Sequence, residues 1–71
     1  MHEQPDPDLA ALLKRLREER DITQEQLAFD AGITVSALSR IERGLNSPGW
    51  TTVKCIAEAL GVSLSELVAG L

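Results

Sequence analysis

Cysteine, histidine and aromatic residues are scarce in this chain, whose 71 residues include one cysteine, one histidine, one phenylalanine, one tryptophan and no tyrosine. The lone thiol of Cys55 cannot form a disulfide within the chain, and one cysteine with one histidine cannot assemble a metal site. A nucleophile paired with a general base and a glycine-rich phosphate loop are also missing. We therefore predict that the protein is not an enzyme and that it holds no cofactor and no metal ion.

Long hydrophobic runs are missing too, since no apolar stretch approaches the length of a membrane-spanning helix. The N-terminus shows no signal-peptide pattern, and the single cysteine fits a reducing compartment, so we expect a cytoplasmic protein without membrane contact. Strand alternation, internal repeats and low-complexity segments are likewise absent. The apolar residues, 44% of the chain, recur at helical spacing and suffice for one small domain.

The middle of the chain has the local signals of two short helices joined by a tight turn. Thr23 and Gln26 have the spacing of a capping box at the start of the first helix. Gly32 follows where a helix end needs a left-handed residue, and Thr34 can cap the second helix. A connector of about three residues suits the crossed helix pair of a helix-turn-helix.

The sizes of the side chains strengthen this interpretation. Ala28 is small enough to sit where the two helices cross, and Ile33, Leu38 and Ile41 can fill the space between them. The alternative, an ordinary helical hairpin within a bundle, does not need this combination. We therefore predict a helix-turn-helix over residues 23–44, with a second helix shaped to enter the major groove of DNA.

The remaining segments complete an all-α fold. Asp6 can cap a helix that has Pro7 at its first position, and Ser63 with Glu66 forms a further capping box. We expect a flexible lead over residues 1–5 and a domain over residues 6–71. The elements of the domain are a helix from 7 to about 20, the helix-turn-helix, a helix over about 50–60 and a short helix through 68.

Several motifs together resemble the Cro/phage-repressor type of helix-turn-helix domain, also called the Xre family. They are the dipeptide LR at 16–17, ITQEQLA at 22–28, AGIT at 31–34, LSRIERG at 38–44 and IAEALGVSLSELV at 56–68. The resemblance covers nearly the whole chain from about residue 8. It implies a compact five-helix, lambda-repressor-like domain that binds operator DNA, usually as a dimer, and commonly regulates transcription.

The start and exposed face of the second motif helix supply the candidate base-reading residues, because reading helices contact bases chiefly near their N-termini. The hydroxyls can donate or accept, a valine can touch a thymine methyl, and an arginine can pair with guanine or reach a phosphate. The family often has a longer polar residue where this chain has valine, so direct readout is thinner here. A competing interpretation leaves the two serines merely solvated. The candidates are Thr34, Val35, Ser36, Ser39 and Arg40.

The resemblance also implies phosphate contacts and one structural ion pair. Gln24 stands where similar proteins contact a phosphate, and Arg43 and Asn46 lie just past the reading helix, although Asn46 could simply serve the turn. Arg17 and Glu42 match an arginine and a glutamate that form a partly buried ion pair in similar proteins. We expect this pair to hold the reading helix against the first helix without touching DNA.

The C-terminal part has more apolar positions than one short helix can bury, which predicts a homodimer contact. We expect Phe29 and Trp50 to pack in the core, with a partner-contact role for Trp50 as the alternative. A C-terminal tail that packs on its own domain is the competing interpretation of the apolar positions. The candidate interface residues are Trp50, Leu64, Leu67, Val68 and Leu71.

The net charge of −4 is unusual for a DNA-binding protein. Several acids lie at the N-terminus, whereas basic residues gather in the first helix (Lys14, Arg15, Arg17 and Arg20) and in the reading helix, and net charge does not describe a local patch. The sequence therefore predicts a DNA-binding regulator, a repressor or autoregulator on a palindromic operator. The alternatives are a DNA-binding antitoxin that also binds a toxin, and a protein-interaction module that kept the fold and lost DNA binding.

Overall fold

A computed structural model describes residues 7–71, and this part of the chain forms five α-helices and no strand. The helices are α1 (Pro7–Glu19), α2 (Gln24–Ala31), α3 (Val35–Glu42), α4 (Trp50–Leu60) and α5 (Leu64–Ala69). The predicted all-α, five-helix fold is therefore confirmed, with helix ends within about one residue of those expected. The expected flexible lead and the capping role of Asp6 lie outside the described residues.

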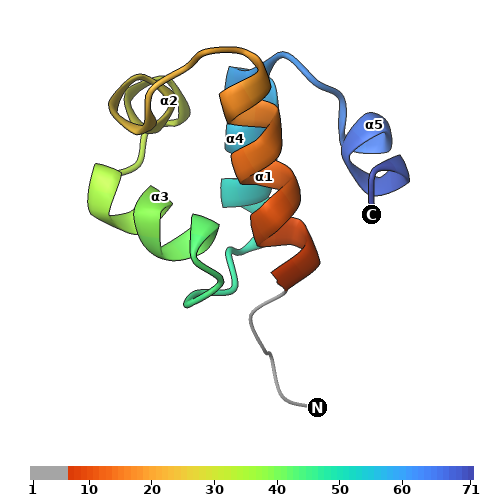
Figure 1. The fold of residues 1–71 in the computed structure, drawn as a ribbon, viewed down its shortest axis with the longest axis horizontal. Helices are drawn as coiled ribbons and strands as arrows, with labels where there is room; N and C mark the ends of the chain where they lie inside the picture. Colours follow the sequence, from red (N-terminus) through yellow and green to blue (C-terminus); the bar gives the residue numbers. More distant parts are fainter. Residues whose placement is uncertain (1–6) are drawn as a thin grey trace.

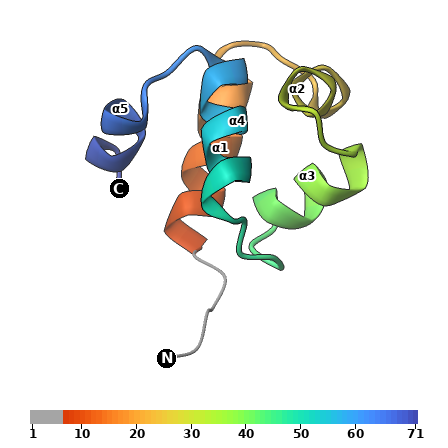
Figure 2. The ribbon, with the colours of Figure 1, turned by 180° about the vertical axis from the view of Figure 1, so that it is seen from behind.

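The helices are arranged so that α2 and α3 lie on one side of the molecule and α5 lies on the other, with α1 and α4 between them in both views (Figures 1 and 2). Helix α2 packs on α3 and α4, α1 packs on α3, and α5 packs on α4. One side of the helix-turn-helix thus packs against α1 and α4, and the outer side of α3 is left uncovered.

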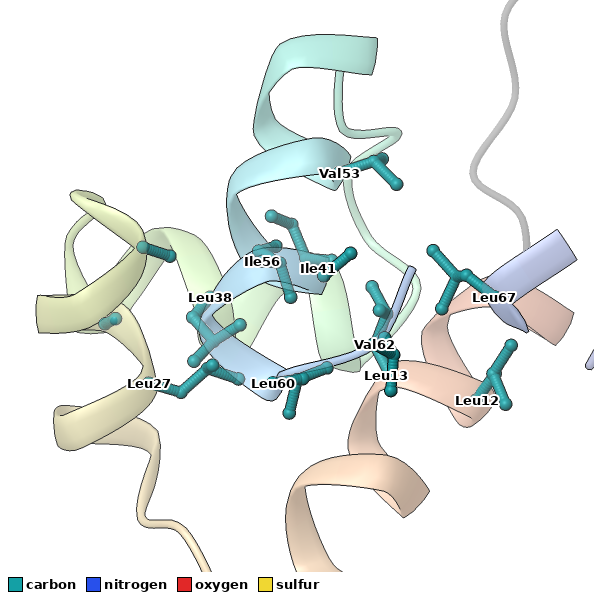
Figure 3. Close-up of a cluster of buried hydrophobic side chains, with 13 residues drawn as sticks. Leu12, Leu13, Leu27, Leu38, Ile41, Val53, Ile56, Leu60, Val62 and Leu67 are labelled. Atoms are coloured by element: carbon teal, nitrogen blue, oxygen red, sulfur yellow. The ribbon is translucent and has the colours of Figure 1, made fainter. Parts of the chain in front are cut away.

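Each of the five helices contributes one fully buried side chain to a single aliphatic core (Figure 3). Burying a leucine or isoleucine contributes roughly 1.5–3 kcal/mol, so this shared cluster provides much of the force that fixes the helices relative to one another. The five residues are Leu13, Leu27, Leu38, Ile56 and Leu67.

The helix ends follow the local signals with one exception. The Thr23 hydroxyl oxygen accepts the backbone N–H of Gln26, and Gly32 adopts the left-handed φ of 74° that ends α2. The expected reciprocal hydrogen bond from the Gln26 side chain back to Thr23 does not form, so this half of the predicted capping box is wrong. The Gln26 side chain donates to Asp30 at 2.9 Å instead. At α5 both halves form, since Ser63 and Glu66 exchange hydrogen bonds of 3.1 Å.

The expected core positions of the two aromatic residues are wrong. Phe29 is 81% exposed, because α2 turns Leu27 and Ala28 inward and the next residue is rotated out to solvent. Trp50 is 65% exposed, because it is the first residue of α4 and the first buried position of that helix, Val53, comes almost one turn later. Within the described residues the core is therefore entirely aliphatic.

Candidate nucleic-acid interface

The helix α3 has one buried face and one solvent-facing face. Leu38 and Ile41 lie in the core, while Val35, Ser36 and Arg40 are exposed. This division follows from helical geometry, because residues three or four apart share a face. The buried pair fixes the position of α3, and the exposed residues form a surface that other molecules can reach.

The structure brings the candidate base-reading residues together at the start and along the outer face of α3. Thr34 caps the helix, and its hydroxyl oxygen accepts the Ala37 N–H at 3.0 Å while the hydroxyl hydrogen remains available as a donor. Ser39 is half-buried, so it is less accessible than Ser36 and Arg40. The outer face therefore offers hydroxyl groups, one apolar contact and one guanidinium group.

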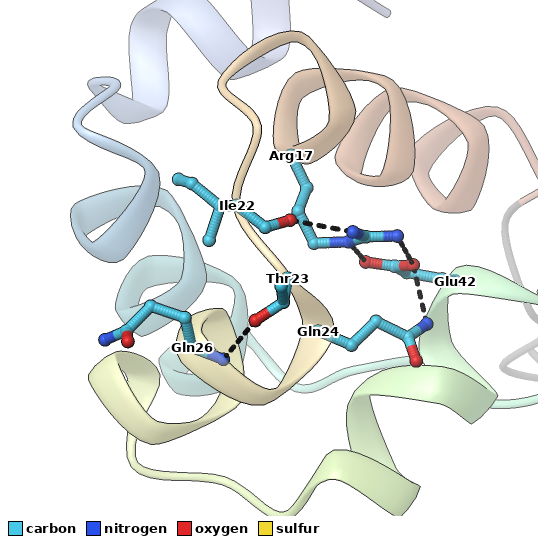
Figure 4. Close-up of polar contacts among 6 residues, drawn as sticks. All are labelled: Arg17, Ile22, Thr23, Gln24, Gln26 and Glu42. Carbon is cyan, nitrogen blue, oxygen red and sulfur yellow. Dashed lines mark hydrogen bonds and ion pairs between the residues drawn. The ribbon is translucent and has the colours of Figure 1, made fainter.

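The candidate phosphate-binding residues lie in two different environments. Arg43 follows the end of α3 and Asn46 lies in the loop before α4, and both side chains are exposed. Gln24 begins α2, is half-buried, and uses its side-chain nitrogen to donate a hydrogen bond of 3.0 Å to Glu42 (Figure 4). No local pattern in the sequence indicates this last contact, because the two residues are 18 positions apart.

The ion pair between Arg17 and Glu42 is present and is nearly enclosed by protein. Arg17 Nε donates to Glu42 Oε2 at 2.8 Å, and Arg17 Nη2 donates to Glu42 Oε1 at 3.0 Å. The side chains are 12% and 2% exposed, respectively. The hydrogen bonds that Arg17 donates to Glu42 raise the pKa of Arg17, and Arg17 Nη1 also donates to the Ile22 carbonyl at 2.8 Å. The guanidinium group thus connects α1, the loop before α2 and the last residue of α3.

Three of the four basic residues in α1 and just past its end have partners, so they do not form the free positive patch that the sequence suggested. Arg17 is paired with Glu42, and Arg15 forms an exposed ion pair of 3.8 Å with Glu19. Arg20 donates to the Leu60 carbonyl at 2.9 Å and so caps the C-terminal end of α4. That contact spans 40 positions, and no local pattern in the sequence could have indicated it.

Two arginines, one on the outer face of α3 and one just past its end, keep their charge free for another partner. Within residues 7–71, Arg40 and Arg43 form neither an ion pair nor a side-chain hydrogen bond. Both side chains are exposed. Despite the overall charge of −4, the positive charge on this side of the molecule is therefore concentrated at α3.

The prediction that Leu67 takes part in a dimer interface is wrong. Leu67 is only 2% exposed, because α5 turns it into the core of its own domain, and Leu64 is half-buried against the same core. Val68 and Leu71 face solvent, as does Trp50 at the start of α4. A partner molecule could therefore reach Val68, Leu71 and Trp50, but not Leu67.

Two further properties concern residues 7–71 alone. None of the helices described there combines the length and the apolarity needed to cross a membrane. The same residues contain no group of three or more histidine, cysteine, aspartate or glutamate side chains that could hold a metal ion.

Comparison with known proteins places the chain in a family. A family model described as Helix-turn-helix matches residues 13–67. The chain is 41% identical to the immunity repressor protein of Bacillus phage phi105 over 56 residues, which is 79% of this chain and 39% of that protein. It is 44% identical over 54 residues to the uncharacterized HTH-type transcriptional regulator y4dJ of Sinorhizobium fredii, covering 76% and 70% of the two chains.

A solved structure shows the same fold. The restriction-modification controller protein C.AhdI from Aeromonas hydrophila superposes with a TM-score of 0.83 at 30% identity, over 86% of this chain and 92% of that one. The chain spans about two fifths of the length of the phage immunity repressor. On the strength of the family match and these likenesses, the chain belongs to the helix-turn-helix family, in its Cro/phage-repressor (Xre) type.

Proposed function

We propose that this protein is a sequence-specific DNA-binding transcriptional regulator, acting as a repressor or autoregulator. The observation that carries the proposal is the surface of α3, where Ser36 and Arg40 are exposed while Leu38 and Ile41 anchor the helix from behind. The similarity to a phage immunity repressor supports a repressor role. The role is binding rather than catalysis, and we place it in the cytoplasm.

In this proposal α3 enters the major groove and reads base edges. Val35 and Ser36 are at the N-terminal end of the helix, where reading helices contact bases, and Arg40 reaches a guanine or a nearby phosphate. Arg43 and Gln24 contact phosphates on either side and fix the position of the helix on the duplex. Because only Arg40 and Arg43 offer free positive charge here, we expect weak binding to non-specific DNA.

A twofold dimer gives the protein enough sequence information to find an operator. One reading helix covers only a few base pairs, whereas two copies read half-sites about one helical turn, ~34 Å, apart. Val68 and Leu71 are exposed apolar residues at the α5 end of the molecule, on the side away from α2 and α3. A contact made there, with Trp50 and Leu64 contributing, leaves both α3 helices free to meet an imperfect palindrome.

The second candidate function is that of a DNA-binding antitoxin. Phe29 favours it, because an aromatic side chain that is 81% exposed on the outer face of α2 can contact a protein partner. DNA binding is common to both candidates, so only the additional partner separates them. Copurification of the product of the neighbouring reading frame with the wild type, and its loss with Phe29→Asp, would favour the antitoxin.

Selection of bound duplexes from a random pool tests the proposal directly. We expect the wild type to enrich an imperfect palindrome with half-sites about 10 base pairs apart. The variant Arg40→Ala should enrich a site that is less defined at one or two positions of each half. Lys54→Ala is the matched control, because this exposed cation lies on α4 and should leave the enriched site unchanged. Failure of the wild type to enrich any sequence would contradict the proposal.

A further inference from the structure

We propose that Glu42 is a positioning residue for DNA binding, which acts by holding the side-chain amide of Gln24 in its donor orientation. The inference rests on the proposed function, in which Gln24 contacts a phosphate. The geometry that carries it is a chain of hydrogen bonds in which Arg17 fixes Glu42 and Glu42 fixes Gln24 (Figure 4). The resemblance assigned Glu42 only a structural role, so the contact with Gln24 adds a function to it.

Glu42 is well suited to hold another side chain, because it cannot move freely itself. Its side chain is 2% exposed, and Oε2 accepts from Arg17 Nε at 2.8 Å. The other oxygen, Oε1, accepts from both Arg17 Nη2 and Gln24 Nε2, each at 3.0 Å. A two-pronged arginine contact fixes the plane of the carboxylate, so Oε1 stays in one position relative to the start of α2.

The carboxylate also decides which end of the Gln24 amide faces it. An ionised carboxylate only accepts hydrogen bonds, so the amide must turn its nitrogen, and not its oxygen, toward Glu42. That nitrogen carries two hydrogens, and the contact with Oε1 uses one of them. The second hydrogen is then available for a phosphate oxygen, and the side chain loses its rotamer freedom on folding rather than on binding DNA.

Arg17 makes this arrangement compatible with a nearby phosphate. A carboxylate without a counter-charge beside Gln24 would repel the DNA backbone. Arg17 is held at hydrogen-bond distance and neutralises that charge, without being placed to reach the duplex itself because it is only 12% exposed. Both partners of the ion pair therefore affect DNA binding through Gln24.

The test compares two double variants that have the same net charge. Arg17→Met with Glu42→Gln removes both charges but keeps an oxygen that can accept from Gln24. Arg17→Met with Glu42→Met removes both charges and the acceptor. Each is made with Gln24 intact and with Gln24→Ala, and binding is measured to a duplex selected by the wild type and to a random-sequence duplex. Gln26→Ala is the matched control, since that glutamine bonds Asp30 instead.

With Gln24 intact, the variant that keeps the acceptor should bind both duplexes about fivefold more tightly, the effect of one hydrogen bond. With Gln24→Ala the two variants should bind equally. An equal difference in both backgrounds would overturn the inference while leaving the proposed function intact. Absence of wild-type binding to any duplex would overturn both.

A measurement on the wild type alone covers the case in which a variant fails to fold. In the ¹H–¹⁵N spectrum of the free protein, the two side-chain amide hydrogens of Gln24 should exchange slowly with water, and their shifts should be displaced from those of an exposed glutamine. Those of Gln26, which is exposed, should exchange faster. A Gln24 amide with the shifts and exchange of an exposed glutamine would overturn the inference without any DNA being present.

Discussion

Glu42 is the one charged residue buried in the described part of the chain, and both of its carboxylate oxygens accept hydrogen bonds. No buried side-chain nitrogen or oxygen in residues 7–71 lacks a partner. Burial of a charge is tolerated only under such conditions, because an unpaired charge in the interior is costly. The sequence predicted the Arg17–Glu42 pair through family resemblance, but it did not predict that Gln24 completes the set.

At the residue scale we predict that Glu42→Ala lowers the free energy of unfolding by about 3 kcal/mol, because it leaves the Arg17 guanidinium enclosed and unpaired. Arg17→Ala should cost a similar amount, and the double variant should cost less than the sum. Urea denaturation of all three proteins measures the coupling. As a control, the exposed Arg15–Glu19 pair should show a coupling of at most about 0.5 kcal/mol. If the losses of unfolding free energy in Arg17→Ala and Glu42→Ala add up to that of the double variant within about 0.5 kcal/mol, the two residues do not interact.

A second prediction at this scale concerns the backbone of Asp21. It is the one non-glycine residue with positive φ in the described chain, at 53°, in the turn between α1 and α2. The left-handed conformation costs an L-residue roughly 1–2 kcal/mol of folding free energy, and glycine does not have this cost. Glycine also has more conformational freedom in the unfolded state, which offsets about half of the stability gained. Asp21→Gly should therefore raise stability by about 0.5–1 kcal/mol in thermal or urea unfolding. The control Glu58→Gly, inside α4, should lower it by about 1 kcal/mol. A loss of stability in Asp21→Gly would mean that its side chain stabilises the turn.

At the scale of the helices, local signals in the sequence were sufficient to locate all five elements, because caps and terminal glycines act within a few residues. Thr23, Thr34 and Ser63 all cap helices as expected. The reciprocal bond from Gln26 failed because Asp30, one turn further on, offers a competing acceptor. Arg20 was misjudged for the opposite reason, since its acceptor on Leu60 becomes a neighbour only after the chain has folded.

The capping box of α5 predicts a pH effect that can be followed at one carboxyl group. The hydrogen bond from the Ser63 backbone N–H lowers the pKa of Glu66 below its ordinary value of 4.5. A lowered folded-state pKa contributes stability above the unfolded-state value, and this contribution is lost as the pH falls through the folded-state pKa. NMR titration should show Glu66 titrating below 4.5 and returning to that value in Ser63→Pro, which removes the N–H. A midpoint of 4.5 or above for Glu66 in the wild type would contradict the prediction.

At the scale of the whole molecule, the family resemblance predicted the fold, whereas the exposure of single side chains needed the structure. Leu67 and Val68 are adjacent and similar in chemistry, yet one lies in the core and the other faces solvent. Phe29 is more apolar than Ala28 but is exposed, because α2 turns Ala28 into the core and rotates the next residue out to solvent. Helices of six and eight residues are too short for the hydrophobic periodicity to decide which of two adjacent apolar residues is buried.

Because Leu67 is buried and Val68 is exposed, a test of dimer formation belongs at Val68. We predict that Val68→Asp lowers the sedimenting mass from dimer to monomer at tens of micromolar, a concentration at which a modest association of ~7 kcal/mol is visible. The folded state should persist, because Val68 is exposed. Phe29→Asp is the matched control and should remain dimeric, since it places the same charge on α2. A wild type that sediments as a monomer yet binds its operator tightly would contradict the dimer.

The central claim is that α3 binds duplex DNA, and a salt-dependent binding titration tests it most directly. The duplexes are the selected operator and a shuffled one, and the proteins are the wild type, Arg40→Ala, Arg43→Ala and the control Lys54→Ala. We expect Arg40→Ala to lose about 1–3 kcal/mol of preference for the operator. Arg43→Ala should weaken both duplexes alike and reduce the salt slope by about one unit for each bound protomer, with Lys54→Ala close to wild type. Equal affinity of the wild type for both duplexes, or variants indistinguishable from it, would contradict the account.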